Sequence, residues 1–169
     1  MIIDPFANPH KDCARLSDLR CGIINAAMPD MDYSHRDVTD KLNVKPGHTV
    51  RVVGCGDPAL LARVRAKTGR RMADGHAPAD VILYWPKTIE EITPTLRELR
   101  QAIQPAGGIW VMTAKRDLTS ASGMKYLNQA ALIPHGLAAG LVDSKICSIS
   151  DNESAMRFVI RRKDRMDKR

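Results

Sequence analysis

Hydrophobic and polar positions beyond residue 46 follow two periods that alternate along the chain. Residues 49–53 (TVRVV) predict a strand, and residues 58–67 carry apolar side chains on one face of a helix. Asp57 is a favourable N-cap and Pro58 a favourable first helical residue. The pattern therefore predicts a strand, a tight Gly54–Asp57 turn and a helix that stops at Thr68-Gly69.

The same alternation continues to the C-terminus. Residues 79–85 (ADVILYW) are apolar apart from Asp80 and show no alternation, which indicates a strand buried on both faces. Thr88 is expected to cap a helix that runs to Ile103, with the next strand at residues 109–113. A third helix is expected over residues 120–134, capped by residues 117–119. Two final strands flank a short DNE turn at residues 151–153, which makes them antiparallel.

This element order predicts an α/β fold with a Rossmann-like, mixed sheet, mostly parallel and ending in an antiparallel hairpin. Residues 46–162 are expected to form that domain. Residues 1–45 form an N-terminal arm with a short helix near 12–28, and Asp37 or Thr39 is expected to cap a turn before Leu42. The arm is expected to pack over the domain or against a second copy of the chain, giving a homo-oligomer. Residues 163–169 form a basic tail.

Composition narrows the function classes. Of 169 residues, 44% are hydrophobic and only 4% are aromatic, so the core is aliphatic and a base-stacking platform is disfavoured. The net charge is +7, concentrated in two basic runs. These runs suit nucleic acid or an acidic partner, and their alternative interpretation is a solvated surface. They comprise Arg63, Arg65, Arg70 and Arg71 in the first and Arg161, Arg162 and Lys163 in the second.

Cysteine usage and hydropathy disfavour a disulfide-linked, metal-binding, secreted or membrane-spanning protein. The four cysteines are widely spaced, so no disulfide framework and no metal site are expected. The first 13 residues lack the apolar core of a signal peptide, and no apolar run reaches 18 residues. A cytoplasmic protein without membrane contact is the expectation.

Several stretches resemble the class I methyltransferases. VRVVGCGD (50–57, with Gly54-Cys55-Gly56) resembles their first motif, ADVILYW their central strand, and LRELRQAIQPAGGIWVMTAK their helix, turn and next strand. The closing residues resemble their final hairpin, so the likeness covers residues 46–163. The resemblance implies a Rossmann-like fold and S-adenosylmethionine as the family's cofactor.

The chain also resembles an uncharacterised bacterial family of actinobacterial type. The matching elements occur in the same order: Tyr33-Ser34, KLNVKPG (41–47), DVILYW (80–85), GGIWVM (107–112), DLT (117–119), GLVDSKIC (140–147) and FVIRR (158–162). This resemblance implies a fold and no established activity.

The chain departs from the methyltransferase pattern around the glycine turn. Val52 stands where active members carry an acid, and Asp57-Pro58 stands where a third small residue is usual. Only 26 residues lie between Gly54 and Val81, too few for a helix and a second strand ending in a ribose-binding acid. Asp74 is at a suitable distance but lies in a loop broken by Gly and Pro.

Ligands of open α/β sheets bind outside the carboxyl ends of the strands. This rule nominates three segments at one edge, with ordinary loop residues as the alternative. The ligand-binding candidates are Gly54, Cys55, Gly56, Asp57, Trp85, Lys87, Lys115 and Arg116. No catalytic residue is assigned, because no nucleophile has a suitably spaced base.

The leading interpretation is a non-catalytic binding or regulatory protein that recognises a small anionic ligand or a protein partner, without a required cofactor. Two alternatives remain: a divergent S-adenosylmethionine-dependent methyltransferase, and a nucleic-acid-binding protein that uses the basic tail.

Overall fold

The computed structural model describes residues 36–75, 77–116 and 118–168. These belong to the second of two compact units, which begins at residue 35. The helix expected near residues 12–28, and most of the predicted arm, lie outside the described residues.

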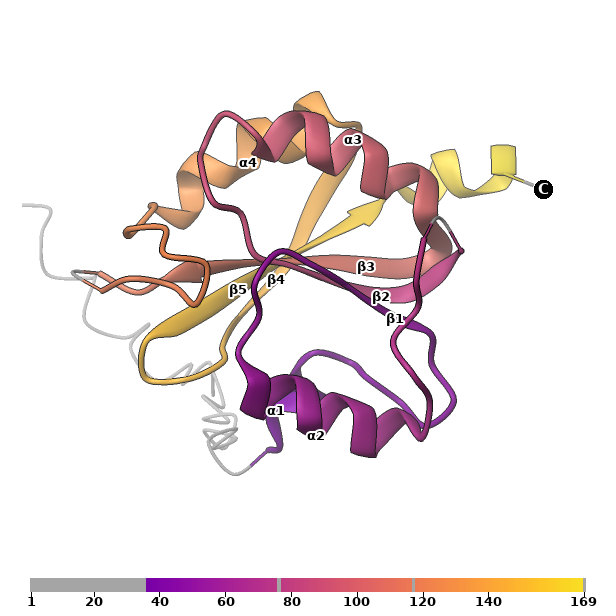
Figure 1. Ribbon diagram of the computed structural model, residues 1–169. Coiled ribbons are helices and arrows are strands. Elements are labelled where there is room, and N and C mark those ends of the chain that lie inside the picture. The colour runs from indigo at the N-terminus through magenta and orange to yellow at the C-terminus, as the bar shows by residue number, and fades with distance from the viewer. Residues whose placement is uncertain (1–35, 76, 117, 169) are drawn as a thin grey trace, which may run out of the picture. The chain divides into compact units, whose positions relative to one another are not determined.

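Five strands form one sheet in the order β1-β2-β3-β5-β4 (Figure 1). β1 (Val50–Val53), β2 (Ala79–Tyr84) and β3 (Ile103–Ala114) are parallel to one another. β5 (Glu153–Ile160) is antiparallel to β3, and β4 (Leu141–Ser148) is antiparallel to β5. The predicted mixed sheet with a C-terminal antiparallel hairpin is thereby confirmed.

Helices cover both faces of the sheet (Figure 1). α1 (Val38–Lys41) and α2 (Pro58–Thr68) lie on one face, and α3 (Ile92–Ala102) and α4 (Gln129–Ala138) lie on the other. A 3₁₀ helix, η2 (Arg162–Lys168), follows β5. This is a three-layer arrangement in which each face of the sheet buries its own apolar cluster.

The cluster on the α2 face includes the end of the predicted arm. Leu42 and Val44 are buried together with Val64 of α2 and Trp110 of β3. The indole N–H of Trp110 donates to the backbone carbonyl of Leu42 at 2.9 Å. As expected, Asp37 caps α1, and its carboxylate accepts from the backbone N–H of Thr39.

Local signals at α2 are confirmed. The Asp57 carboxylate accepts from the backbone N–H groups of Ala59 and Leu60, both at 3.2 Å, and Pro58 is the first helical residue. Gly69 ends the helix in the left-handed conformation with φ of 64°.

The predicted start of α3 is wrong by three residues, because the N-cap is Glu91 and not Thr88. The helix begins at Ile92, and residues 85–91 form a loop instead of its first turn. The Glu91 side chain holds this loop, because its Oε1 accepts from the backbone N–H of Lys87 and from the hydroxyl of Tyr84. Burial raises the pKa of Tyr84 to about 12, so the phenol keeps its proton and donates. β3 also begins earlier than predicted, at Ile103.

The helix predicted over residues 120–134 is wrong in its first half. Gly123 takes φ of 85°, and a bridge pairs Thr119 with Lys125, so residues 120–128 form a turn-rich loop. α4 starts at Gln129, where Asn128 caps it by accepting from the backbone N–H of Ala130. The prediction that residues 117–119 cap this helix is therefore wrong, because its N-cap is Asn128. Met124 and Leu132 are buried as expected, whereas Ala131 is exposed.

Candidate functional site

The glycine turn after β1 is shaped by Trp85. Gly54 has φ of 88°, and a Cβ there would collide with the backbone carbonyl of Trp85. A Cβ on Gly56 would lie 2.9 Å from the six-membered ring of the same residue. Trp85 is completely buried, so neither the ring nor the carbonyl can move away cheaply. Both glycines are therefore required by packing, which agrees with the structural part of the prediction.

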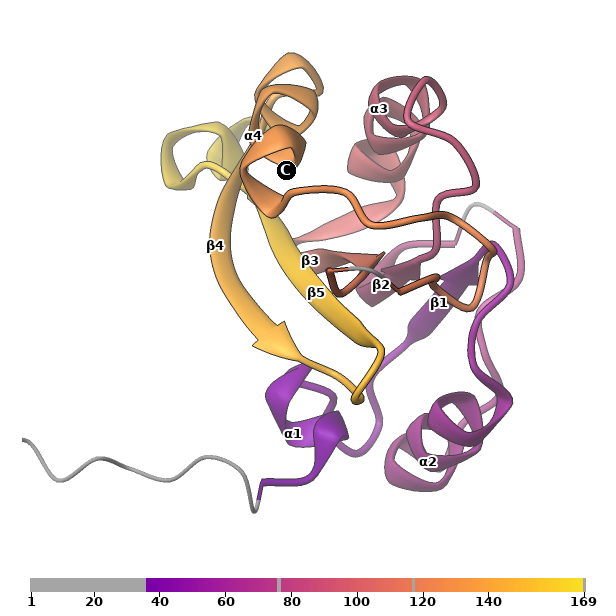
Figure 2. The same ribbon diagram turned by 90° about the vertical axis from the view of Figure 1, so that its left-hand side faces the viewer.

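A pocket of about 480 Å³ lies beside this turn, at the carboxyl ends of the strands. Its walls come from the glycine turn, the loop between β3 and α4, and the tip of the β4–β5 hairpin. Figure 2 faces this edge and shows the orange loop passing across the ends of β3, β2 and β1. The lining residues are Cys55, Gly56, Asp57, Pro58, Thr119, Ser120, Ala121, Ser150, Asn152 and Glu153.

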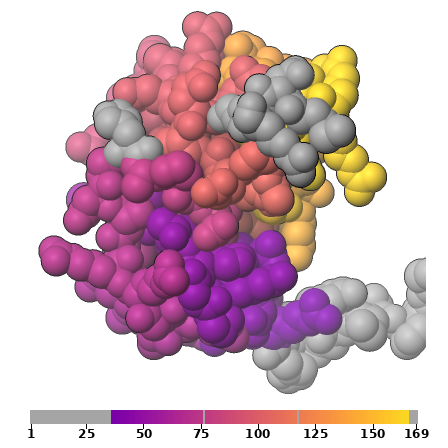
Figure 3. All heavy atoms as spheres, turned by 90° about the vertical axis from the view of Figure 1, so that its right-hand side faces the viewer, coloured from indigo at the N-terminus to yellow at the C-terminus, as the bar shows by residue number. Residues whose placement is uncertain are grey.

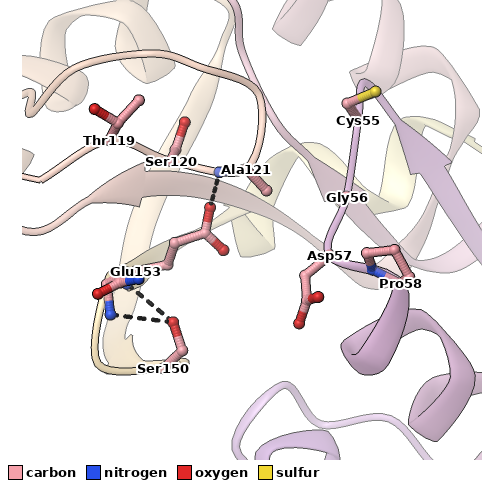
Figure 4. Close-up of a pocket in the computed structure, with 10 residues that line it drawn as sticks. Cys55, Gly56, Asp57, Pro58, Thr119, Ser120, Ala121, Ser150 and Glu153 are labelled. Carbon is pink, nitrogen blue, oxygen red and sulfur yellow. Dashed lines mark hydrogen bonds between the residues drawn. The ribbon is translucent and has the colours of Figure 1, made fainter.

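Glu153 is the buried acid of this pocket (Figure 4). Only 5% of the residue is exposed. Its Oε1 accepts from the backbone N–H of Ala121 at 2.6 Å, and its Oε2 accepts from the indole N–H of Trp85 at 3.4 Å. Ser150 Oγ accepts from the backbone N–H of Glu153 at 3.1 Å and thereby fixes the start of β5.

The pocket is lined by two carboxylates and by no basic side chain. Asp57 already accepts from the two free N–H groups nearest the start of α2, so those donors are not open to an anion. Neither ion pair of the described residues involves Asp57 or Glu153. A buried carboxylate with only neutral donors is stabilised by a nearby positive group. The electrostatics of the pocket therefore favour a ligand that carries positive charge.

The predicted ligand-binding residues divide into three groups. Cys55, Gly56 and Asp57 line the pocket. Gly54 and Trp85 do not line it, but Trp85 packs against the glycine turn that does. Lys87, Lys115 and Arg116 are not among the lining residues, although the backbone N–H of Lys115 donates to Asn152 at the hairpin tip.

The two basic runs lie away from this pocket. Arg63 forms an ion pair with Asp37 across α1 and α2. Arg65, Arg70 and Arg71 are exposed at the other end of α2, and Arg161, Arg162 and Lys163 are exposed after β5.

Sequence reasoning missed Glu153, Ser120 and Ser150. They come from two distant segments, the loop between β3 and α4 and the tip of the β4–β5 hairpin, and the hairpin prediction assigned Glu153 to a turn. The one sequence signal for Glu153 is its place as an acid at the start of a largely apolar strand, and this signal does not identify a pocket.

No strand lies beyond β1 in the described part of the chain. The loop after α2 touches β1 through one hydrogen bond, from the backbone N–H of Ala73 to the carbonyl of Val50 at 2.8 Å. Val50 is the first residue of β1. The segment with Ala73 and Asp74 therefore lies beside the amino end of β1, whereas the glycine turn follows its carboxyl end. Within residues 36–168 as described, no helix is long and apolar enough to cross a membrane, and no three metal-ligating side chains cluster.

Comparison with solved structures identifies the fold. A SAM-dependent methyltransferase from Aquifex aeolicus aligns with a TM-score of 0.57 at 14% identity, over 73% of this chain and 88% of that one. CalO1, a methyltransferase in calicheamicin biosynthesis in its SAH-bound form, aligns with a TM-score of 0.56 at 17% identity, over 73% and 52%. The pyocyanin biosynthetic protein PhzM aligns with a TM-score of 0.56 at 10% identity, over 73% and 53%.

No protein-family model matches the chain, and no curated protein is significantly similar to it in sequence. At these identities the likeness concerns the backbone arrangement. The chain therefore has the Rossmann-like fold of the class I methyltransferases.

Proposed function

We propose that the chain is a divergent S-adenosylmethionine-dependent methyltransferase, with its cofactor in the pocket beside the glycine turn. The observation that carries this proposal is the pairing of Asp57 and Glu153 in a pocket without basic side chains. S-adenosylmethionine carries a sulfonium and an ammonium group, and both are attracted by carboxylates. The fold and the place of the pocket at the carboxyl ends of the strands support the same proposal.

The residues present fit one end of this cofactor better than the other. Gly56 lines the pocket, and Glu153 is held in place by Ala121 and Trp85. When bound, S-adenosylmethionine supplies a methyl group to a nucleophile. The pocket residues would hold the charged end of the cofactor, and the described residues form no strand on the outer side of β1 that could supply an acid for its ribose.

That missing strand favours a second candidate, a non-catalytic protein that uses the methyltransferase frame to bind a small anionic ligand or a protein partner. Since Asp57 and Glu153 disfavour an anion inside the pocket, such a ligand would contact the edge at Lys87, Lys115 and Arg116. These three side chains do not line the pocket.

Calorimetric titration of the full chain with S-adenosylmethionine and with S-adenosylhomocysteine distinguishes the two candidates. We expect saturable micromolar binding of S-adenosylmethionine, and weaker binding of S-adenosylhomocysteine because its sulfur is neutral. Glu153→Gln removes the charge but keeps an acceptor for Ala121, and it should weaken S-adenosylmethionine binding about tenfold.

Glu98→Gln on the exposed side of α3 is the matched control and should change neither affinity. Circular dichroism at each titration temperature verifies that the variants are folded. If the folded protein binds neither compound, the methyltransferase proposal is wrong and the non-catalytic candidate is favoured.

A further inference from the structure

The amino ends of the parallel strands form an edge opposite to the pocket. β1, β2 and β3 all begin there, and β5 ends there because it runs antiparallel to β3. α2 also returns to this edge, where the carbonyl of Thr68 accepts from the backbone N–H of Gly47 at 3.0 Å. Segments that are 90 residues apart in sequence are thereby brought to one side of the molecule.

Residues from both basic runs lie at this edge. Arg70 and Arg71 follow α2 just before Ala73, which is bonded to the start of β1. Arg161, Arg162 and Lys163 follow Ile160, the last residue of β5. Figure 3 faces this side and shows the magenta segment after α2 and the yellow C-terminal segment on the same face.

The sheet register gives the spacing between the strands beside the two runs. Val50 of β1 is opposite Val81 of β2, which is opposite Gly108 of β3. The neighbouring Ile109 is opposite Phe158 of β5. Three strand spacings separate β1 from β5, which is about 14 Å at about 4.8 Å per strand. Arg70 and Arg71 lie further out, because the carbonyl of Val50 that accepts from Ala73 faces away from β2.

Exposed positive charge dominates this edge. Acids at the same edge are fewer, and one of them is engaged, since Oδ2 of Asp80 accepts from the backbone N–H of Thr49 at 2.8 Å. The exposed basic side chains are those of Lys45, Arg70, Arg71, Arg161, Arg162 and Lys163. The acids are Asp74, Asp80, Asp143 and Asp164.

We propose that this amino-end edge, defined by those six basic residues, binds the phosphate backbone of double-stranded nucleic acid without reading its sequence. Two separate groups of exposed cations at one edge suit the phosphates of a duplex, which carries negative charge on both strands. A single strand is disfavoured, because no described residue places an exposed aromatic ring at this edge. The rings of Tyr84, Trp85, Trp110 and Phe158 are buried, and Tyr126 belongs to the loop between β3 and α4 at the opposite edge. The proposal does not depend on the cofactor pocket.

Fluorescence anisotropy with a labelled 20-base-pair duplex of mixed sequence tests the proposal on the full chain. We expect a dissociation constant of about 10⁻⁴ to 10⁻⁶ M that rises steeply with salt, because each neutralised phosphate contributes about −0.9 to the slope of log K against log salt. Changing the sequence of the duplex should leave the affinity within about twofold.

A charge-matched pair of triple variants locates the surface. Arg161→Gln, Arg162→Gln and Lys163→Gln together should reduce the magnitude of the salt slope by about 2 to 3. Arg97→Gln, Lys125→Gln and Lys145→Gln together remove the same charge from exposed positions outside the amino-end edge and should leave the slope unchanged. Melting temperatures of both variants verify folding.

Three results would overturn the proposal. The first is an absence of duplex binding by the folded protein, and the second is an equal loss of slope in both triple variants. The third is stronger binding of a single strand, or of an acidic polypeptide such as polyglutamate, than of the duplex at the same salt, which would indicate a stacking site or an acidic protein partner.

Discussion

Gly54 combines two constraints at one residue. Its φ of 88° is in the left-handed region, and the backbone carbonyl of Trp85 occupies the space that a Cβ would need. Gly75 also has a positive φ of 68°, but nothing lies within 4 Å of its Cβ position. A side chain at Gly54 would therefore meet both backbone strain and a steric collision, whereas a side chain at Gly75 would meet backbone strain alone.

Gly54→Ala should lower the free energy of unfolding by about 2–5 kcal/mol, since it adds overpacking to strain. Gly75→Ala should cost about 1 kcal/mol from strain alone. Chemical denaturation of both variants measures the difference, and equal losses would show that the contact with Trp85 contributes nothing.

Asp37 gives a second residue-scale prediction. Hydrogen bonds from the side chain and backbone N–H of Thr39, and then from Arg63, hold the pKa of this carboxyl well below its usual range. A lowered folded pKa means that its stabilisation is present above pH of about 4 and is lost as the pH falls below that value.

Asp37→Ala should therefore lower the free energy of unfolding by about 1 kcal/mol at pH 7, and this difference should shrink in acid below pH of about 4. Asp40→Ala, which removes only the ion pair with Lys67, should cost less than about 0.5 kcal/mol. Denaturation midpoints at pH 7 and in the acid range test both statements. A difference between Asp37→Ala and the wild type that grows in acid would contradict the assignment.

At the scale of elements, the short α1 segment belongs to the core of the sheet domain. Leu42, directly after α1, is completely buried, and its carbonyl accepts from the indole N–H of Trp110. Leu42→Ala in the full chain should lower the free energy of unfolding by about 2–5 kcal/mol. Asn43→Ala, at an exposed position with φ of 56°, is the neighbouring control and should cost about 1–2 kcal/mol. If the two losses are equal, the burial of Leu42 is not a major source of stability.

The contact between α4 and β5 is another property of elements. A Cβ on Gly136 would overlap the ring of Phe158, so the absence of a side chain sets how closely the helix approaches the sheet. Helix propensity alone predicts that Gly136→Ala stabilises by about 1 kcal/mol. We expect destabilisation of about 1–3 kcal/mol instead, and partial recovery when Phe158→Leu is added. Thermal denaturation of the single and double variants measures both effects, and a stabilised single variant would contradict the packing argument.

At the scale of the whole molecule, the acidic pocket and the six basic residues lie at two different edges of the sheet. The pocket with Asp57 and Glu153 lies at the carboxyl ends of the strands, and the six basic residues lie at the opposite edge. β2 has six residues, so the edges are about 20 Å apart, more than the Debye length of about 8 Å at physiological salt.

The two edges should therefore act independently. Glu153→Gln should leave duplex affinity unchanged at 0.15 M salt, and the triple variant at residues 161–163 should leave S-adenosylmethionine affinity unchanged. Anisotropy and calorimetry on the same preparations measure these cross-effects. A change of more than about threefold in either would show that the edges are coupled.

Elements whose signals are local were predictable from the chain alone. Asp57, Pro58 and Gly69 mark α2 through their own backbone and capping preferences, and the apolar run at residues 79–84 marks β2 by its composition. The antiparallel hairpin followed from a turn too short for any other connection. Such signals depend on neighbours within a few residues, so they need no tertiary information.

Contacts between distant segments set the remaining features. The start of α3 depends on Glu91 bonding to Lys87 and Tyr84, and the loop at residues 120–128 lies where Ala121 meets Glu153. The pocket joins segments near residues 55, 120 and 152, and the basic edge joins segments near residues 70 and 162. Periodicity and composition describe each segment separately, whereas charge and cavity shape arise from side chains that only folding brings together.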